Sequence, residues 1–207
     1  MLRAFAALLL SSLVSTAVSC SAFRKEEPVG EEAVFAKAYK YFERGKNQQA
    51  AEYFNRLLEQ YPRTRYRTQT QMLLGEAYFR DELYEEAKLV FSQFIQLHPA
   101  HKDAEVAYFR LGDCDFEQIE RKDRDQSFTS QALEAYERAL RLYPRSSRRD
   151  EIGERIMFCK NRLAEHEYAI ARYYYKRKHY APAADRFRFI AERYPDVDLT
   201  DDALYLL

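Results

Sequence analysis

The chain of 207 residues contains no tryptophan and little glycine or proline, with five and six residues respectively. Proteins built from sheets need many tight turns, which Gly and Pro supply, so this scarcity argues against an all-β fold and favours helix. Neither charge is in excess, because 33 Lys and Arg balance 33 Asp and Glu. Nucleic-acid binding requires a basic excess or a basic face. The composition therefore predicts a largely helical protein that does not bind nucleic acid.

Cysteine and histidine are also scarce. Three Cys, at positions 20, 114 and 159, and four His form neither a C-x-x-C nor an H-E-x-x-H motif. A disulfide framework and a recognisable metal site are thereby excluded, and no nucleophile or acid pair marks a catalytic centre. We therefore expect no cofactor, no metal and no enzyme activity; a cell-wall hydrolase would need such a pair. Cys114 and Cys159 lie in apolar helical stretches, which favours buried thiols and leaves open a disulfide between them.

The first residues have the pattern of a secretory signal. A basic start, Met1-Leu2-Arg3, precedes an apolar stretch that is too short to cross a bilayer. Residues 1–19 are accordingly predicted to be a signal peptide, and residues 20–30 a polar tether. The run Ala17-Val18-Ser19-Cys20 resembles a bacterial lipobox, although Ala17 replaces the usual Leu. We expect Cys20 to carry acyl chains that anchor the protein. The alternative is an ordinary signal that leaves Cys20 as a free thiol.

Residues 31–207 are dominated by an internal repeat. In each copy an alanine lies four positions before an aromatic residue, and a proline lies eight positions after that aromatic residue. The four copies are Ala50-x3-Phe54, Ala87-x3-Phe91, Ala132-x3-Tyr136 and Ala183-x3-Phe187, with Pro62, Pro99, Pro144 and Pro195. Upstream lie Leu74-Gly75-x2-Tyr78 and Leu111-Gly112-x2-Asp115, and weaker forms at Lys37-Ala38-x2-Tyr41 and Ile170-Ala171-x2-Tyr174. This pattern resembles the tetratricopeptide repeat. The predicted fold is all-α, a tetratricopeptide-repeat solenoid of antiparallel helix pairs with four repeats and the start of a fifth.

The spacing of the motifs is irregular in two places. Residues 117–126 form an insertion between the helices of the third repeat, and such insertions map to loops on one face of a solenoid. Residues 149–178 contain no Pro and keep a helical period of apolar residues, which predicts one long helix. After Pro195, Thr200 is expected to cap a further helix, within which the chain ends at Leu207.

An aromatic stripe recurs on the first helix of each repeat, away from the face that packs on the second helix. Its members and neighbours are Phe35, Tyr39, Phe42, Met72, Phe79, Phe109, Phe116, Tyr168, Arg172 and Tyr175, with Glu76 and Asp113 beside them. First helices line the concave groove of such solenoids, where peptides and partner domains bind. The stripe therefore predicts a groove for an extended segment with aromatic side chains. Packing of one repeat on the next explains the same spacing equally well.

The whole arrangement resembles one family, the BamD-type lipoproteins of the outer-membrane β-barrel assembly machine. These proteins combine a lipobox, about five tetratricopeptide repeats, and an insertion with a D-R-D element in the third repeat, here Asp123-Arg124-Asp125. Residues 160–168, followed by Tyr173-Tyr174, are also similar to the family's fourth repeat. The second half of the fifth repeat is missing, which affects the expected C-terminal partner surface. By composition alone the charged insertion would be a solvated loop; the resemblance instead implies a partner loop of Arg121, Asp123, Arg124, Asp125 and Gln126.

The resemblance implies a non-catalytic scaffold that is lipid-anchored to the outer membrane and faces the periplasm. Its groove would receive unfolded outer-membrane protein segments, and its fourth and fifth repeats would bind a BamA-type barrel subunit, with other assembly lipoproteins as further partners. The alternative within the same class is a periplasmic tetratricopeptide adaptor for cell-wall or envelope-constriction machinery. Such adaptors more often have a soluble form or an N-terminal coiled coil, and neither feature is present in the sequence.

Overall fold

A computed structural model describes residues 28–119 and 125–207. The predicted signal peptide, Cys20 and most of the tether lie outside these residues. The described part of the chain consists of helices joined by short turns, with no strand among them. In order these are α1 (Glu31–Glu43), α2 (Asn47–Gln60), α3 (Arg67–Arg80), α4 (Tyr84–Leu97), α5 (Ala104–Phe116), α6 (Ser127–Leu142), α7 (Arg149–Lys176), α8 (Tyr180–Arg193) and α9 (Leu199–Tyr205).

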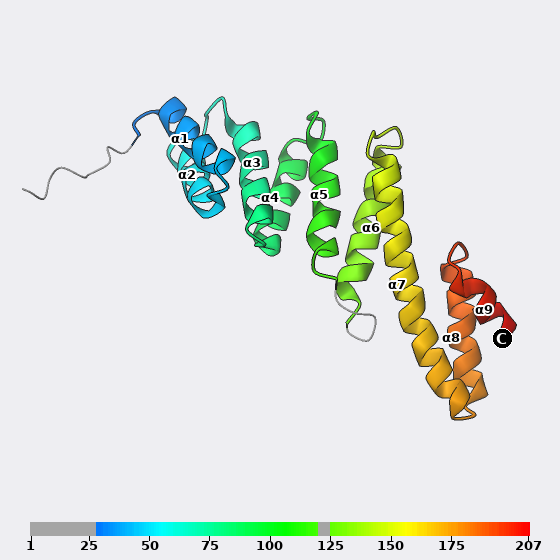
Figure 1. Cartoon of the computed structure of the whole chain (residues 1–207). Helices are drawn as coiled ribbons and strands as arrows, with labels where there is room; N and C mark the ends of the chain where they lie inside the picture. The colour runs from blue at the N-terminus through cyan, green and yellow to red at the C-terminus, as the bar shows by residue number, and fades with distance from the viewer. Residues whose placement is uncertain (1–27, 120–124) are drawn as a thin grey trace, which may run out of the picture.

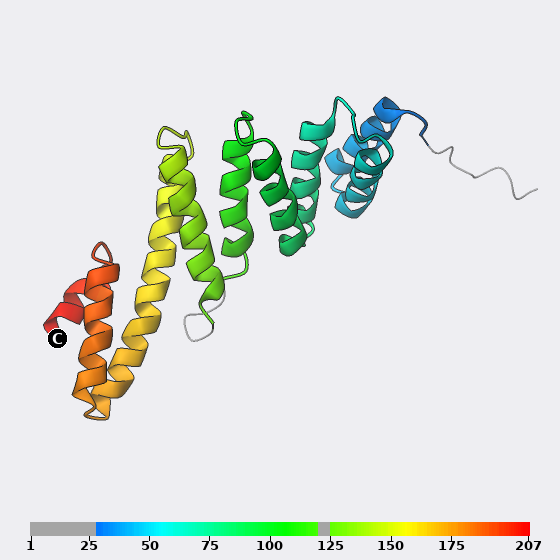
Figure 2. The ribbon, with the colours of Figure 1, turned by 180° about the vertical axis from the view of Figure 1, so that it is seen from behind.

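The helices form hairpins that stack side by side into an elongated solenoid (Figures 1 and 2). Each helix contacts the next one along the chain, so α1–α2, α3–α4, α5–α6 and α7–α8 are the four pairs, and α9 packs on α8 and α7. The tetratricopeptide-type fold predicted from the repeat is therefore confirmed. Within the described residues, no helix is long and apolar enough to cross a membrane.

The repeated prolines end the second helix of every pair, as the sequence predicts. The residue before each proline has left the helical conformation, with φ of −126° at Tyr61, −134° at His98, −124° at Tyr143 and −129° at Tyr194. Steric contact with the proline ring disfavours helix at that preceding position. Each second helix therefore stops at the same point of its repeat, and the chain returns to start the next pair.

Small residues let the two helices of a pair approach closely. The alanines of the motif are buried, with Ala50, Ala87 and Ala132 wholly inaccessible. A Cβ atom placed on Gly75 would lie 2.6 Å from Cε1 of Phe91, and one placed on Gly112 would lie 2.5 Å from Cε1 of Tyr136. Both distances are far below van der Waals contact, so glycine is required at these two crossings.

The long helix of the fourth repeat is confirmed, although it ends two residues earlier than expected. It stops at Lys176 because Lys178 has a φ of 62°, a left-handed conformation that cannot continue a helix. In the first repeat Gly45, with a φ of 67°, occupies the same turn. The expected cap at Thr200 is wrong: its hydroxyl donates to the carbonyl oxygen of Tyr194 at 2.5 Å and does not cap α9.

Candidate functional site: the face of the first helices

The residues predicted to line a groove differ widely in exposure. Tyr39, Arg172 and Tyr175 are exposed, whereas Phe35, Met72, Phe79, Phe116 and Tyr168 are half-buried. Phe42 and Phe109 are buried, with 8% and 0% of their surfaces exposed. The prediction of an open aromatic stripe is therefore wrong for Phe42 and Phe109, which are packed between repeats. The other members remain partly or fully accessible from the solvent.

Arginines from the first helix of the next repeat cover the rings, and this is why the stripe is not open. The guanidinium of Arg80 on α3 lies 4.2 Å from the ring centre of Phe42 on α1, and that of Arg110 on α5 lies 4.8 Å from Phe79 on α3. The contact recurs at α5, where Arg148, the residue before α7, covers Phe109 at 5.2 Å and Arg155 on α7 covers Phe116 at 5.1 Å. Each contact is a cation–π interaction, which is favourable at these distances.

Carboxylates alternate with these arginines along the same face. Glu76 lies 3.2 Å from Nε of Arg80 and 2.9 Å from Nε of Arg110. Further along, Glu151 on α7 accepts two hydrogen bonds from Arg148, at 2.9 and 3.0 Å. Those hydrogen bonds, ahead of the nearby positive charges, lower the pKa of Glu151 below its usual value. The face is therefore a row of paired charges set over aromatic rings.

Asp113 on α5 is the centre of the row. Its side chain is almost fully buried, and its Oδ1 accepts hydrogen bonds from Nη1 of Arg155 at 2.7 Å and from the Tyr136 hydroxyl at 2.8 Å. Its Oδ2 accepts one from Nη1 of Arg110 at 3.0 Å and lies 3.6 Å from Nη2 of Arg148. A buried charge is tolerated only when it is paired and hydrogen-bonded in this way.

The environment of Asp113 also fixes the protonation of its neighbours. Burial, and then the charge of Asp113, raise the pKa of Tyr136, so the hydroxyl remains a hydrogen-bond donor at physiological pH. Asp113 was expected only to lie beside the groove; instead it joins α5, α6 and α7. The chemistry of this cluster is structural, and within the described residues no group of three or more His, Cys, Asp or Glu could hold a metal ion.

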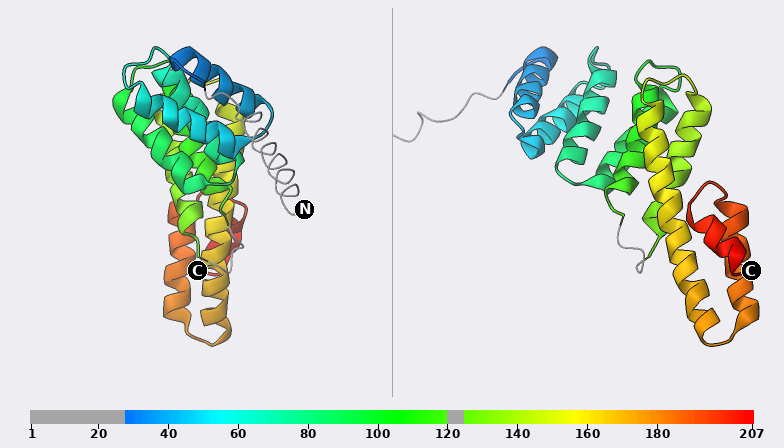
Figure 3. Two further views of the ribbon diagram at one scale, coloured as in Figure 1. Left: turned by 90° about the vertical axis from the view of Figure 1, so that its left-hand side faces the viewer. Right: turned by 45° about the vertical axis from the view of Figure 1, so that its right-hand side comes forward.

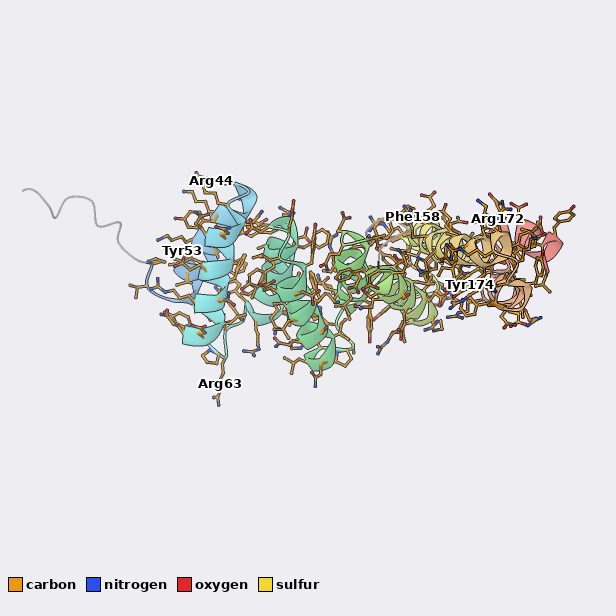
Figure 4. All side chains as sticks on the ribbon, turned by 90° about the horizontal axis from the view of Figure 1, so that it is seen from below. Arg44, Tyr53, Arg63, Phe158, Arg172 and Tyr174 are labelled. Carbon is orange, nitrogen blue, oxygen red and sulfur yellow. The ribbon has the colours of Figure 1, made fainter. Side chains whose placement is uncertain are left out.

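Phe158 on α7 is a surface residue that the groove prediction omitted. It is 42% exposed, its ring centre lies 5.2 Å from that of Phe116, and Arg162 lies 5.3 Å from it. Seen from below, Arg44, Phe158 and Arg172 lie along one edge of the molecule, and Arg63 lies on the opposite edge (Figure 4). Phe158 therefore extends the accessible aromatic surface from the third repeat to the fourth.

The predicted partner loop lies only partly within the described residues, because Arg121, Asp123 and Arg124 are outside them. Asp125 is exposed, and its carboxylate accepts hydrogen bonds from the backbone N–H of Ser127 at 3.1 Å and from its hydroxyl at 2.9 Å. Gln126 is 9% exposed and accepts a hydrogen bond from the Thr129 hydroxyl at 3.0 Å. The side chain of Gln126 thus stabilises the start of α6 and offers little accessible surface to a partner.

The two thiols within the described residues are buried, as the sequence predicts. Cys114 on α5 and Cys159 on α7 are both inaccessible and are not joined in a disulfide. Burial raises the pKa of each thiol to about 12, and the nearby carboxylates of Asp113 and Asp115 add to the effect at Cys114. A thiol with so high a pKa is a weak nucleophile at neutral pH, so neither Cys marks a reactive site.

A family model described as YfiO, outer membrane lipoprotein, matches residues 28–207, which is the entire helical array. The chain belongs to this family. The YfiO match begins just before α1 and runs through α9, so it covers the row of rings and charges as well as the repeat framework.

Several curated relatives support the assignment to the YfiO family, and each is named outer membrane protein assembly factor BamD. The protein of Caulobacter vibrioides is 30% identical over 183 residues, which cover 88% of this chain and 59% of the relative. That of Pasteurella multocida is 26% identical over 216 residues and that of Rickettsia prowazekii 28% over 162 residues, covering 82% and 64% of those proteins. The chain thus spans between about three fifths and four fifths of these relatives.

Solved structures of other repeat proteins are also similar in fold. The first tetratricopeptide domain of Spaghetti (RPAP3), bound to an HSP90 peptide, covers 67% of this chain with a TM-score of 0.49 and 22% identity, and 96% of that domain is aligned. The tetratricopeptide protein TTC0263 of Thermus thermophilus covers 86% of this chain with a TM-score of 0.46 and 17% identity, over 98% of its own length.

Proposed function

We propose that the chain is a non-catalytic scaffold subunit of the outer-membrane β-barrel assembly machinery. Membership of the YfiO family and the names of the relatives support this role. In the proposal the face of α1, α3, α5 and α7 binds unfolded barrel segments. The observation that carries it is the row of partly exposed aromatic rings, set among paired charges, that runs over successive repeats and includes Phe79, Phe116 and Phe158.

The chemistry of the face suits an extended segment with aromatic side chains. An unpaired strand offers aromatic rings together with free backbone N–H and C=O groups. The exposed rings of Tyr39 and Phe158 provide stacking partners, which contribute through their area and their edge-to-face geometry. Carboxylates such as Glu76 can accept backbone N–H groups. Because the charges on the face are already paired, the binding should depend more on rings than on net charge.

The test measures affinity for a peptide that ends in alternating aromatic residues, by fluorescence anisotropy. Replacing Tyr39 and Phe158 by Ser removes two accessible rings, and we expect the affinity to fall about tenfold, since each aromatic contact contributes about 0.5–1.5 kcal/mol. The control is Leu89→Ser, which removes an apolar side chain that is 60% exposed on α4, away from the face of the first helices. Loss of affinity in the control alone, or in neither variant, would contradict the proposed surface.

The proposal further places the protein at the outer membrane, facing the periplasm and anchored by acyl chains on Cys20. It assigns a BamA-type barrel subunit to the fourth and fifth repeats, and other assembly lipoproteins to the insertion. Reversing the charges of Asp123 and Arg124 tests the insertion, because Asp125 must be kept to start α6. We expect unchanged helicity and weaker co-purification of the partner subunits. Undiminished co-purification would indicate that the insertion is a solvated loop without a partner role.

A further inference from the structure

The hairpin of α7 and α8 carries a concentrated group of basic and tyrosine residues at its turn. We call this group the basic tip; it consists of Arg172, Tyr173, Tyr175, Lys176, Arg177, Lys178 and Tyr180. The turn lies at the far end of the hairpin and projects from one end of the molecule (Figure 1 and the right-hand view of Figure 3). Residue 28, where the described chain begins, is at the opposite end (Figure 1).

The positive charge of the basic tip is not compensated. Residues 168–184 contain no Asp or Glu. The nearest acidic residues are already used, because Glu167 pairs with Arg186 at 2.6 Å and Asp185 with Arg188 at 3.0 Å. Within the part of the chain that the structure describes, the four cations of the tip form no ion pair. On the face of the first helices, in contrast, every ring-covering arginine is paired with a carboxylate.

Exposed tyrosines alternate with these cations. Tyr173, Tyr175 and Tyr180 expose 52%, 40% and 58% of their surfaces. The rings are ordered by contacts with one another and with the cations: Tyr175 meets Tyr180 edge to face at 5.6 Å, and Arg177 lies 4.3 Å from the ring centre of Tyr173. Tyrosine and basic residues together are the side chains that favour the boundary between membrane and water.

The turn itself holds a basic residue where glycine would be easier. Lys178 has a φ of 62°; the same turn has Gly45 in the first repeat and Glu82, with a φ of 60°, in the second. A left-handed conformation is unfavourable for a residue with a Cβ atom. Of the two described side chains held in this conformation, the one at the basic tip is a cation.

We propose that the basic tip rests on the anionic surface of a phospholipid bilayer. The turn projects from one end of the described helices, so a flat surface can meet it (Figures 1 and 3). Its exposed tyrosines suit the interface of a bilayer, which an acidic polypeptide does not offer. Each Lys or Arg near an anionic leaflet contributes about a fivefold gain in partitioning. With the anchor proposed for the N-terminus, a contact at the other end of the molecule would hold it along the membrane. The inference does not depend on substrate binding by the first helices.

The tip can be tested with the full chain, because its cations are themselves trypsin sites. The protein is mixed with vesicles of phosphatidylcholine, or with vesicles that contain one third phosphatidylglycerol, and the rate of the cut after Arg177 is measured. The cut after the exposed Arg63, on the opposite edge of the molecule, serves as the internal reference. We expect anionic vesicles to slow the cut at Arg177 tenfold or more in low salt, and 0.5 M salt to abolish the effect, since salt screens exposed charges.

Two variants of equal charge make the test specific. The first variant combines Arg172→Gln, Lys176→Gln and Lys178→Gln, and it keeps the trypsin site at Arg177. Its partitioning onto anionic vesicles should fall about a hundredfold, so the vesicles should no longer protect Arg177 from trypsin. The matched control, Lys40→Gln, Arg44→Gln and Lys46→Gln, removes three exposed cations around the α1–α2 turn and should keep the protection. Equal cutting on both vesicle types, or loss of protection in the control as well, would overturn the proposal. Protection by polyglutamate but not by anionic vesicles would also overturn it, in favour of an acidic protein partner.

Discussion

Replacing Gly112 by Ala should destabilise the protein, although alanine is the better helix former. The added Cβ would lie 2.5 Å from Cε1 and 2.6 Å from Cδ1 of Tyr136. That ring has no room to retreat, because Tyr136 is fully buried and its hydroxyl is hydrogen-bonded to Asp113 and Arg155. Overpacking of this kind costs about 1–3 kcal/mol. Weakening a hydrogen bond to the charged Asp113 adds up to about 1.5–3 kcal/mol, and the gain in helix propensity offsets about 1 kcal/mol.

Gly153→Ala is the matched control, because it makes the same chemical change within a helix. Gly153 lies in α7, and a Cβ built on it has no neighbour within 4 Å. Only the helix-propensity gain then remains, so this variant should be more stable than the parent by about 0.5–1 kcal/mol. The two substitutions should therefore change the free energy of unfolding in opposite directions.

Urea unfolding followed by far-ultraviolet circular dichroism measures both changes. We expect the midpoint to fall for Gly112→Ala and to rise for Gly153→Ala. In thermal unfolding each kcal/mol should shift Tm by about 2–4 °C for a domain of this size. If Gly112→Ala is as stable as the parent, then the close crossing of α5 and α6 does not require glycine, and the register assigned to the repeats is wrong.

Three further predictions concern single groups. Tyr136→Phe should lower the free energy of unfolding by about 1.5–3 kcal/mol, because Asp113 loses a buried donor; a midpoint within error of the parent in urea would contradict this. Cys114 and Cys159 should not react with a thiol reagent at pH 8 until the chain is unfolded, and rapid labelling of the native chain at both positions would exclude burial. The stability that these thiols contribute should be present below pH 9. It should decline between about pH 9 and 12, because there the unfolded thiols ionise and the folded ones do not. Cys20→Ser should leave the protein extractable by alkaline or high-salt washing, whereas a variant that stays with the membrane would place the anchor elsewhere.

The architecture could be predicted because its determinants are local or strictly periodic. A proline at a fixed distance after each Ala-x3-aromatic motif ends the second helix by a steric rule that needs no tertiary information. Gly75 and Gly112 identify the close crossings in the same way. The small errors fall at helix ends, where the outcome depends on a single conformation, such as the left-handed backbone of Lys178.

The groove was harder to predict because its exposure depends on residues from the neighbouring repeat. Phe42 and Phe79 occupy equivalent positions, yet the arginines that cover them lie 38 and 31 residues further along the chain. No fixed spacing connects ring and cation, so inspection of one repeat cannot find the contact. The buried role of Asp113 is unpredictable for the same reason. The sequence places it only beside the groove, and its burial arises where α5, α6 and α7 meet.

The Asp113 cluster also explains how so long a helix as α7 is held in register. Apolar surfaces are non-directional, so packing alone would permit small sliding of α7 along its neighbours. Arg148 and Arg155 are seven residues apart, about two turns of helix, and both reach the same carboxylate, Arg155 at 2.7 Å and Arg148 at 3.6 Å. Sliding in either direction would break one of these contacts within a buried site, where an unpaired charge is costly. The far end of α7, which carries the basic tip, is therefore positioned by a carboxylate on α5.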